Sequence, residues 1–347
     1  MGIVLTALAV IFVFGLIIFI HEAGHFLAAR LVGIGVYEFS LGFGPRLGGF
    51  KRHKTEYSLR LVPLGGYVRL VGMDPEDKER EAPYSFARKP VWSRMLVILA
   101  GPFMNFFLAV LLLAIVFLWQ GIPVATTRIA EVLPHYPAAA AGFKPGDRIV
   151  AIDGQPVNSW KEIARIIGRG PSQERTITVE RDGKLTDLVV SPQPDETGKN
   201  KIGIVPVVVN ERPGLLGSLK QGIVATANMI KLILLFLGHL LLHQAPADIG
   251  GPVRIAVETG KVAQMGLSPL LQFTAFLSIN VGFFNLLPIP ALDGARFLFL
   301  FWEGVTRRPL DPKKENLIHL VGFALLLFLI VVITYRDLLH LTGGMGK

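Results

Sequence analysis

Residues 2–26 read GIVLTALAVIFVFGLIIFIHEAGHF, and this stretch decides the fold of the chain. Residues 2–20 carry no charge, and an apolar run of about 18 residues or more is long enough to cross a bilayer. The run has no basic segment before it and leads directly into His-Glu-Ala-Gly-His instead of a small-residue cleavage site. We therefore interpret it as a helix of the mature protein, not as a signal peptide.

The composition of the whole chain also points to a membrane protein. Hydrophobic residues make up 51% of the 347 positions and charged residues 18%, whereas soluble domains carry about 25% charged residues. Three further uncharged runs meet the same length criterion, at residues 95–119, 266–292 and 317–335. We predict a polytopic α-helical membrane protein with four transmembrane helices and at least one water-exposed domain.

The composition excludes several kinds of site. With no cysteine in the chain, there is no disulfide scaffold, no thiolate zinc site and no cysteine nucleophile. A catalytic metal must therefore be bound by His, Asp or Glu. The net charge of +9 is compatible with nucleic-acid binding, but basic residues in a membrane protein mark the cytoplasmic loops. We expect no nucleic-acid partner.

Charges in the loops predict the orientation. Residues 30–94 contain 12 Lys and Arg against 7 Asp and Glu, whereas residues 120–219 contain 12 against 11. Because Lys and Arg are retained on the cytoplasmic side, the first loop is predicted to be cytoplasmic and the second extracytoplasmic. We therefore expect the protein in a membrane that borders the cytoplasm.

Residues 221–242 are ambiguous by hydropathy, because Lys231 interrupts an otherwise apolar segment. A crossing here would put Asp293 on the side of the membrane opposite the histidines that end the first helix. We therefore predict an interfacial or re-entrant amphipathic helix on the outer face.

The outer segment is predicted to be a compact α+β domain. Strand-like stretches alternate with Gly, Pro and Asp turns, and an amphipathic helix fits residues 159–167. The strand-like stretches lie at residues 128–132, 148–152, 176–181, 185–190 and 202–209. The small-residue helix and Gly-Asp turn at residues 138–154 resemble a bacterial PDZ domain, a module that binds an extended peptide at a sheet edge. A generic β-rich domain remains the alternative.

On the cytoplasmic side, residues 57–72 alternate in part and contain the pair Gly65-Gly66. This pattern predicts a membrane-associated β-hairpin with a Gly-Gly turn. Residues 74–81 are highly charged and are predicted to form a solvated loop.

His21-Glu22-Ala-Gly-His25 matches the His-Glu-x-x-His pattern. Positions i and i+4 share one face of a helix, so two imidazoles can bind one metal ion while Glu22 acts on a bound water. The short pattern also occurs by chance, as polar residues packed at a helix end. A carboxylate inside a membrane helix costs about 3 kcal/mol and is normally functional, which favours the metal site. Catalytic zinc needs a third protein ligand.

The candidate for that ligand is Asp293, in the sequence NLLPIPALDG at residues 285–294. Pro288 and Pro290 break the helix, which a membrane tolerates only where protein or water satisfies the freed carbonyls. The segment is therefore predicted to line a cavity. A helix C-cap followed by an Asp-Gly turn is the alternative for Asp293.

The two motifs, with a PDZ-like domain between them, resemble the site-2 protease family of intramembrane zinc metalloproteases, and within it the bacterial regulator-of-sigma-E group. The resemblance extends to AGPFMNF at residues 100–106, GGYV at residues 65–68 and GGPVRIA at residues 250–256. It covers nearly the whole chain. One PDZ-like domain is present here, whereas the best-known enterobacterial members carry two.

The resemblance implies roles for individual residues. His21, His25 and Asp293 would bind Zn²⁺, and Glu22 would be the general base that activates water and later protonates the leaving amine. Substrate contacts are expected from residues near these four. They are Asn285, Asn105, Gly65, Gly66, Pro288 and Pro290. For Asn285, satisfying carbonyls freed by Pro288 is an equal alternative.

The resemblance further implies an endopeptidase that makes the second cut in regulated intramembrane proteolysis. Its substrates would be single-pass proteins of the anti-sigma-factor type or remnant signal peptides. The edge of the Gly65-Gly66 hairpin would hold the unwound substrate as an added strand. The PDZ-like domain would bind a peptide C-terminus or exclude substrates with bulky outer domains.

Two other classes of protein share some of these features. A catalytically inert PDZ scaffold with a structural metal site is disfavoured by Glu22, which structural zinc does not need. A transporter would also contain broken helices and intramembrane acids, but the chain has no internal repeat.

Each predicted region has definite boundaries. They are transmembrane helix 1 at 1–30, a cytoplasmic loop with the hairpin at 31–94, transmembrane helix 2 at 95–119, the PDZ-like domain at 120–212, the interfacial region at 213–265, transmembrane helix 3 at 266–294, a cytoplasmic loop at 295–316 and transmembrane helix 4 at 317–338.

Overall fold

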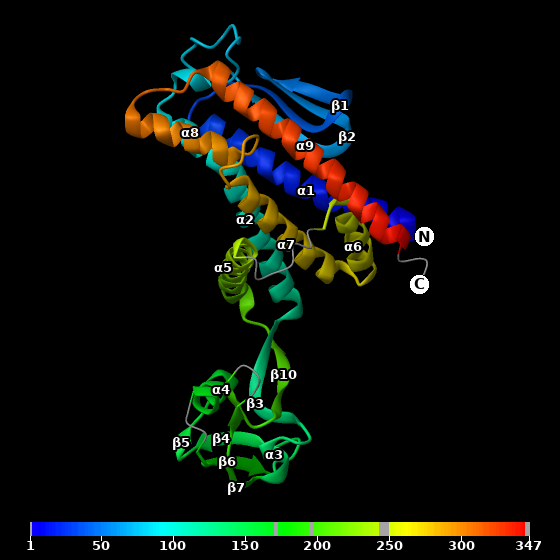
Figure 1. The fold of residues 1–347 in the computed structure, drawn as a ribbon, viewed down its shortest axis with the longest axis vertical. Coiled ribbons are helices and arrows are strands. Elements are labelled where there is room, and N and C mark those ends of the chain that lie inside the picture. The colour runs from blue at the N-terminus through cyan, green and yellow to red at the C-terminus, as the bar shows by residue number, and fades with distance from the viewer. Residues whose placement is uncertain (1, 170–172, 195–197, 243–249, 344–347) are drawn as a thin grey trace. The chain divides into compact units, whose positions relative to one another are not determined.

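The computed structural model describes residues 2–169, 173–194, 198–242 and 250–343. It divides into two compact units, shown in Figure 1. The first, which we call the helical unit, comprises Met1–Val116 and Leu215–Lys347. The second, the inserted domain, comprises Phe117–Gly214.

Apolar helices dominate the helical unit. They are α1 (Gly2–Leu31), α2 (Val91–Gln120), α5 (Gly214–Leu241), α6 (Pro252–Gln264), α7 (Leu267–Asn285), α8 (Asp293–Thr306) and α9 (Pro312–Gly343). By length and composition, α1, α2, α5, α7 and α9 could each cross a membrane. This is one helix more than the uncharged runs suggest, because α5 passes the hydropathy criterion despite its lysines.

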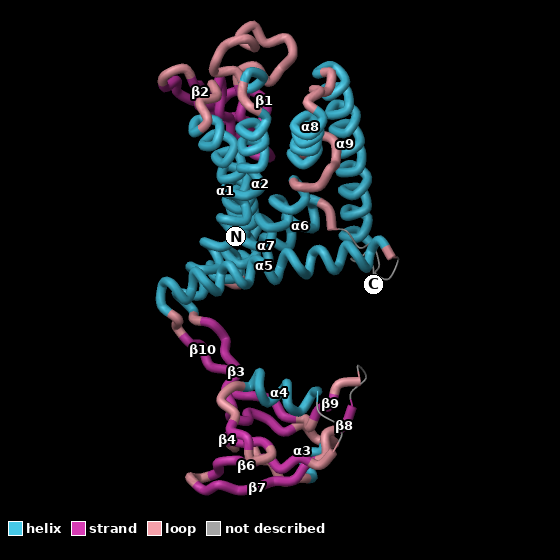
Figure 2. Tube along the Cα trace, turned by 90° about the vertical axis from the view of Figure 1, so that its left-hand side faces the viewer, coloured by secondary structure: helices cyan, strands magenta, loops and turns pink. Residues whose placement is uncertain are grey.

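The direction of α5 differs from that of its neighbours. Figure 1 shows α5 end-on and α1, α2 and α9 lengthwise, and in Figure 2 α5 runs across the helices that stand upright. A Cβ on Gly222 of α5 would lie 2.7 Å from the carbonyl oxygen of Val110 in α2, so the two backbones cross at close range.

The predicted hairpin at residues 57–72 is part of a larger sheet, and its expected Gly-Gly turn is wrong. β1 (Val36–Arg52) and β2 (Thr55–Leu70) pair around a turn at residues 53–54, where His53 has φ 54°. Gly65 and Gly66 lie inside β2. Glycine within a strand often marks a close approach of another group to the backbone, and Gly66 is such a position.

The register leaves residues 66–69 at an edge of this sheet. Residues 38–41 of β1 pair with residues 66–69 on one side and with residues 56–59 on the other. Among the described residues no further strand pairs with residues 66–69. Large apolar side chains of the sheet are exposed, including Leu47 and Phe50.

The predicted third membrane helix, residues 266–294, is two helices joined by a bent segment. α7 ends at Asn285, and α8 begins at Asp293. Pro288 and Pro290 lie between them, and a proline has no N–H with which to continue a helix. Asp293 therefore lies in the first turn of a helix, where the helix dipole favours an acidic residue.

Other predicted boundaries are close to the observed ones. The first helix ends at Leu31, the second spans Val91–Gln120, and the last spans Pro312–Gly343. The predicted loop at 295–316 is mostly helical, because it contains the greater part of α8.

The inserted domain is an antiparallel sheet with one long helix. Its strands follow the order β10-β3-β4-β6-β7, and β5 pairs with β4. The sheet elements are β3 (Ile122–Val132), β4 (Arg148–Ile152), β5 (Gln155–Pro156), β6 (Arg175–Arg181), β7 (Lys184–Val190) and β10 (Ile204–Glu211); α3 (Pro137–Ala140), α4 (Trp160–Arg169), β8 (Gln193–Pro194) and β9 (Asn200–Lys201) complete it. The strand-like stretches of the sequence are all present, and β3 begins six residues earlier than expected.

The predicted Gly-Asp turn before β4 is held by a buried ion pair. Asp147, only 1% exposed, accepts hydrogen bonds from Arg181 at 2.7 Å and from the Lys144 N–H at 2.8 Å. Burial alone would raise the pKa of Asp147, but these hydrogen bonds outweigh it and lower the pKa below its usual value. The stabilisation from this carboxylate is therefore present at neutral pH and is lost as the pH falls through that lowered value.

Candidate active site

Three side chains from distant parts of the sequence meet in the helical unit. The Nε2 atoms of His21 and His25 lie 3.2 Å apart, and Asp293 Oδ2 lies 3.1 Å from the first and 3.3 Å from the second. Within the described part of the chain, these three residues form the group of His, Asp or Glu side chains whose spacing suits a metal ion. The structure thus brings together the three ligands predicted from the two motifs.

Hydrogen bonds set the tautomer of each imidazole. His25 Nδ1 lies 2.8 Å from the carbonyl oxygen of Val97, which only accepts, so Nδ1 carries the proton and Nε2 a lone pair. His21 Nδ1 lies 3.3 Å from the Asn105 amide. Turned by 180°, that amide would accept from Nδ1 through Oδ1, a buried atom that otherwise has no partner. Both Nε2 atoms are then free to bind a metal.

The residues fit zinc. The histidine side chains are 12% exposed and that of Asp293 is 21% exposed, and Asp293 Oδ2 is buried without a hydrogen-bond partner. Three lone pairs that face one another in a poorly solvated site are well placed to bind a cation. Tetrahedral zinc with bonds of about 2.0–2.1 Å places its ligand atoms about 3.3 Å apart, which agrees with the observed separations.

Glycines in the helices bring α1 and α2 together at the site. A Cβ on Gly24 would overlap the carbonyl oxygen of Ala100, and a Cβ on Gly101 would overlap the His25 ring. Small residues at such crossings let membrane helices pack backbone to backbone. The sequence AGPFMNF of α2 therefore supplies the space that the His25 ring occupies.

Asn105 lies beside a metal ligand and not on an open surface. Its side chain is fully buried, and its backbone carbonyl accepts a hydrogen bond of 2.8 Å from Ser278 Oγ in α7. A Cβ on Gly282 would lie 2.9 Å from the Pro102 carbonyl oxygen, so α7 also packs closely on α2. The contact with His21 Nδ1 indicates that Asn105 orients this ligand, and its predicted contact with substrate stays a prediction.

Glu22 lies where the sheet meets α1. A Cβ on Gly66 would lie 3.0 Å from Glu22 Cγ and 2.9 Å from the Ser40 carbonyl oxygen. The free edge of β2 therefore passes next to the predicted general base. Gly65, by contrast, has φ 129°, and a Cβ there would overlap the Phe43 ring, so this position requires glycine; its predicted contact with substrate stays a prediction.

The proline segment carries Asp293 to the histidines. Asn285 donates a hydrogen bond of 3.0 Å to the Val281 carbonyl oxygen in its own helix, so it does not satisfy a carbonyl freed by Pro288. Ala291 has φ 78°, and its N–H donates to His319 Nδ1 at 3.0 Å. Sequence reasoning missed His319, because an isolated histidine in an apolar run carries no motif.

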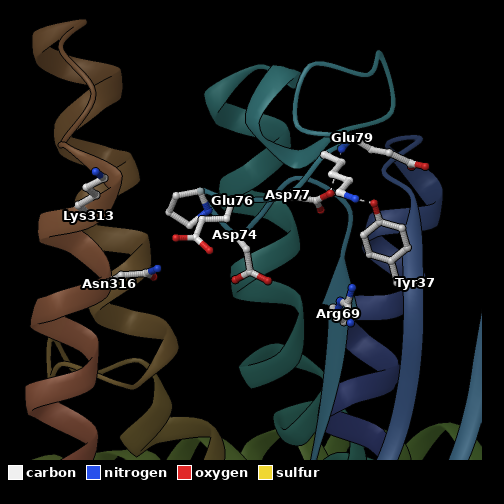
Figure 3. A pocket seen from close by; sticks show the side chains of 10 residues that line it. Tyr37, Arg69, Asp74, Glu76, Asp77, Glu79, Lys313 and Asn316 are labelled. Carbon is white, nitrogen blue, oxygen red and sulfur yellow. Dashed lines mark hydrogen bonds between the residues drawn. The ribbon is translucent and has the colours of Figure 1, made fainter.

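The predicted solvated loop at residues 74–81 borders a separate polar pocket of about 1060 Å³, shown in Figure 3. Asp77 anchors this loop by accepting hydrogen bonds from Tyr37 Oη at 2.9 Å and from the Gly72 N–H at 2.7 Å. Lys313 and Asn316 of α9 line the opposite side of the pocket. None of the metal-ligand candidates lines it.

Comparison with known proteins agrees with this site. The model of peptidase family M50 matches residues 9–329 of the chain. The chain belongs to peptidase family M50. A protein of Geobacillus kaustophilus named zinc metalloprotease RasP is 36% identical to this M50 peptidase, over 96% of this chain and 97% of its own length. The regulator of sigma-W protease RasP of Bacillus subtilis is 34% identical to this chain. The similarity covers 97% of this chain and 99% of the B. subtilis protein. The resemblance to site-2 proteases is thereby confirmed.

Among solved structures, the PDZ domain of an SdrC-like protein from Listeria innocua resembles part of this M50 peptidase. It is 25% identical and covers 23% of this chain and 92% of its own, with a TM-score of 0.22. A score this low carries no argument about the fold.

Proposed function

We propose that this chain, a zinc metalloprotease of peptidase family M50, is an intramembrane endopeptidase that cuts the transmembrane segment of single-pass proteins. The meeting of His21, His25 and Asp293 around one point in an apolar helical unit carries this proposal. Glu22, the neighbour of a ligand on the same helix, supports catalysis over a structural metal site. A structural zinc does not need an adjacent carboxylate.

Zinc held by these three residues would supply Lewis acidity, which lowers the pKa of a bound water and polarises the scissile carbonyl. The Glu22 carboxylate takes a proton from the attacking water. It then gives that proton to the amide nitrogen as the C–N bond breaks, so that the base is regenerated. Asn105 and the Val97 carbonyl hold the two imidazoles with Nε2 toward the Asp293 carboxylate, the arrangement that would bind the zinc.

A helical substrate must be unwound before its peptide bond is accessible, because a helix keeps its carbonyls in internal hydrogen bonds. We propose that residues 66–69 of β2 hold the unwound segment as an added strand. The proximity of Gly66 to Glu22 supports this role, since a strand paired there would lie beside the general base.

We expect Gly66→Pro to lower the cleavage rate by about 10-fold or more relative to Gly66→Ala, with zinc retained in both. Both variants add a Cβ next to Glu22, but proline also removes the backbone N–H, and lost backbone pairing is worth about 1–2 kcal/mol. Cleavage rates and zinc content of the purified variants provide the measurement. Equal rates would contradict pairing through this edge.

We propose four membrane crossings, with α5 on the extracytoplasmic surface. The crossing direction of α5 and α2 supports this placement, as does the requirement that α1 and α8 bring their ligands to the same depth. The inserted domain, which we interpret as PDZ-like, is then extracytoplasmic. The exposed apolar side chains of the β1–β2 sheet support its contact with the membrane from the cytoplasmic side.

The chain lacks cysteine, so single cysteines report this topology directly. We expect Lys220→Cys and Leu242→Cys, near the two ends of α5, both to react with a membrane-impermeant maleimide added outside intact spheroplasts. Reaction of the two positions from opposite sides would show that α5 crosses the membrane and would refute the four-crossing arrangement. A cysteine in the cytoplasmic loop, Lys78→Cys, serves as the negative control.

The B. subtilis relative is named a regulator of sigma-W protease. We propose by analogy that anti-sigma-factor-like proteins, or remnant signal peptides, are substrates here after a first cut outside the membrane. The location is proposed to be the bacterial cytoplasmic membrane. The inserted domain would then select trimmed substrates, by binding their new C-terminus or by excluding bulky outer domains.

The purified protein tests this proposal with two forms of one single-pass substrate, one with a short outer tail and one with a folded outer domain. We expect the short form to be cut within its transmembrane segment, at a site located by product masses, and the long form to be cut at least 10-fold more slowly. A cut outside the membrane segment would contradict the proposal.

A further inference from the structure

The segment that carries Asp293 is bound to α9 through a strained residue. Ala291, two residues before Asp293, has φ 78°, a left-handed conformation that residues with a side chain rarely adopt. Its N–H donates to His319 Nδ1 at 3.0 Å. Strained backbone persists only where its surroundings hold it, and it concentrates at functional sites.

A second contact joins α9 to the same segment one turn further on. A Cβ on Gly322 would overlap the Pro290 side chain and lie 2.8 Å from the Pro290 carbonyl carbon and oxygen. His319 and Gly322 are three residues apart and therefore lie on one face of α9. On this face, His319 supplies a hydrogen-bond acceptor to the segment, and Gly322, which has no side chain, lets the segment pack against the backbone of α9.

The other backbone hydrogen bonds in this region are local. In the described part of the chain, Ile289 N–H donates to the Leu287 carbonyl at 2.7 Å, and Leu292 N–H donates to the Ile289 carbonyl at 3.0 Å. These tight turns shape the segment but do not fix it to another helix. The bond to His319 does so, two residues before the ligand.

The tautomer of His319 also indicates that its Nδ1 atom serves as a hydrogen-bond acceptor. Because Nδ1 accepts from an N–H, Nε2 carries the ring proton, yet Nε2 is buried without a hydrogen-bond partner. The nearest charged group to Nε2 is Glu315 Oε1, at 4.0 Å, which is too far for a hydrogen bond. The hydrogen bond of His319 therefore lies at Nδ1, and an apolar side chain at this position could not accept it.

We propose that His319 is a positioning residue for the metal site and that, with Gly322, it makes α9 the element that holds Asp293 at the two histidines. This inference rests on the proposed metal site. His319 does not belong to the group of residues with metal-ligand spacing. It accepts the Ala291 N–H and thereby fixes the backbone from which the Asp293 carboxylate projects, as hydrogen bonds behind a first ligand commonly do.

The test is the affinity of the detergent-purified full-length protein for Co²⁺ and Zn²⁺, measured by competition with a chelator and by the d–d spectrum of Co²⁺. His319→Leu removes the acceptor. His319→Asn restores it, because Asn Oδ1 is as many bonds from Cα as His Nδ1. His319→Gln places its oxygen one bond further out, at the distance of Nε2. Gly322→Ala pushes α9 away from Pro290, and Leu325→Ala, at a 63% exposed position of α9, is the control.

We expect His319→Leu, His319→Gln and Gly322→Ala to lose about 10- to 100-fold in metal affinity, the usual effect of removing such support, with an altered Co²⁺ spectrum. His319→Asn and Leu325→Ala should stay within about threefold of the wild type. Unchanged affinity in His319→Leu would overturn the proposal, and so would an equal loss in His319→Asn, since that result would indicate packing and not hydrogen bonding. A wild-type protein that binds neither metal would instead refute the metal site and the proposed function.

Discussion

Glu22→Gln is expected to lower cleavage by about 10²–10⁴-fold, the usual contribution of a general acid–base group, while zinc stays bound. Glutamine has the shape of glutamate, but its neutral amide neither takes a proton from water nor returns one to the leaving nitrogen. Metal binding should persist, because the three ligand atoms belong to His21, His25 and Asp293.

The measurement for Glu22→Gln is the single-turnover cleavage rate of a trimmed single-pass substrate, together with zinc content per chain by elemental analysis. His21→Ala is the matched comparison, since it should lose both zinc and activity. If Glu22→Gln, loaded with zinc, cut at more than about a tenth of the wild-type rate, Glu22 would not be the general base.

Gly101→Ala is expected to weaken zinc binding by about 10²-fold or more, although alanine is the smallest possible addition. The new Cβ would overlap the His25 ring, which must then leave its position and lose its hydrogen bond to the Val97 carbonyl oxygen. Loss of a hydrogen bond that orients a ligand already costs 10- to 100-fold in affinity, and here the ligand atom itself moves.

Gly15→Ala in α1 is the matched control for Gly101→Ala. A Cβ at Gly15 meets nothing within 4 Å, and both substitutions exchange glycine for alanine inside a membrane helix. Chelator competition on the two purified proteins measures the difference. Equal zinc affinity of the two variants would show that the close packing of α1 on α2 does not position His25.

The metal site could be predicted from the sequence because its parts obey local rules. The i, i+4 spacing placed His21 and His25 on one face of a helix, and the unfavourable energy of Glu22 in a membrane helix argued for function. Asp293 is more than 260 residues away, and no local rule connects it to them. Its assignment depended on the resemblance to a family, and the observed distances of 3.1 and 3.3 Å agree with it.

The turn of the β-hairpin could not be predicted correctly, for a physical reason. Gly65-Gly66 has the composition of a tight turn, but the structure uses these glycines where β2 passes Phe43 and Glu22. The observed turn contains His53 at φ 54°, and nothing in its local composition indicates a turn. From the sequence alone, a glycine that a turn requires cannot be distinguished from a glycine that close packing requires, because the packing partners are distant in the sequence.

Two further features could not be predicted from the sequence. They are the boundaries of α7 and α8 and the contacts that α9 makes with the proline segment. Hydropathy showed one apolar run from residue 266 to 292, whereas the structure ends α7 at Asn285 and starts α8 at Asp293. Proline predicts that a helix breaks but not where the next one begins. The contacts of His319 and Gly322 with the proline segment depend on the approach of α9, which no local pattern encodes.

The most direct test of the central claim is cleavage of a trimmed single-pass substrate by the detergent-purified protein before chelation, after chelation and after zinc is restored. The account predicts cleavage within the transmembrane segment, its loss on chelation and its return with one equivalent of zinc per chain. Cleavage that persists in metal-free protein would contradict the assignment of His21, His25 and Asp293 as the ligands of a catalytic zinc.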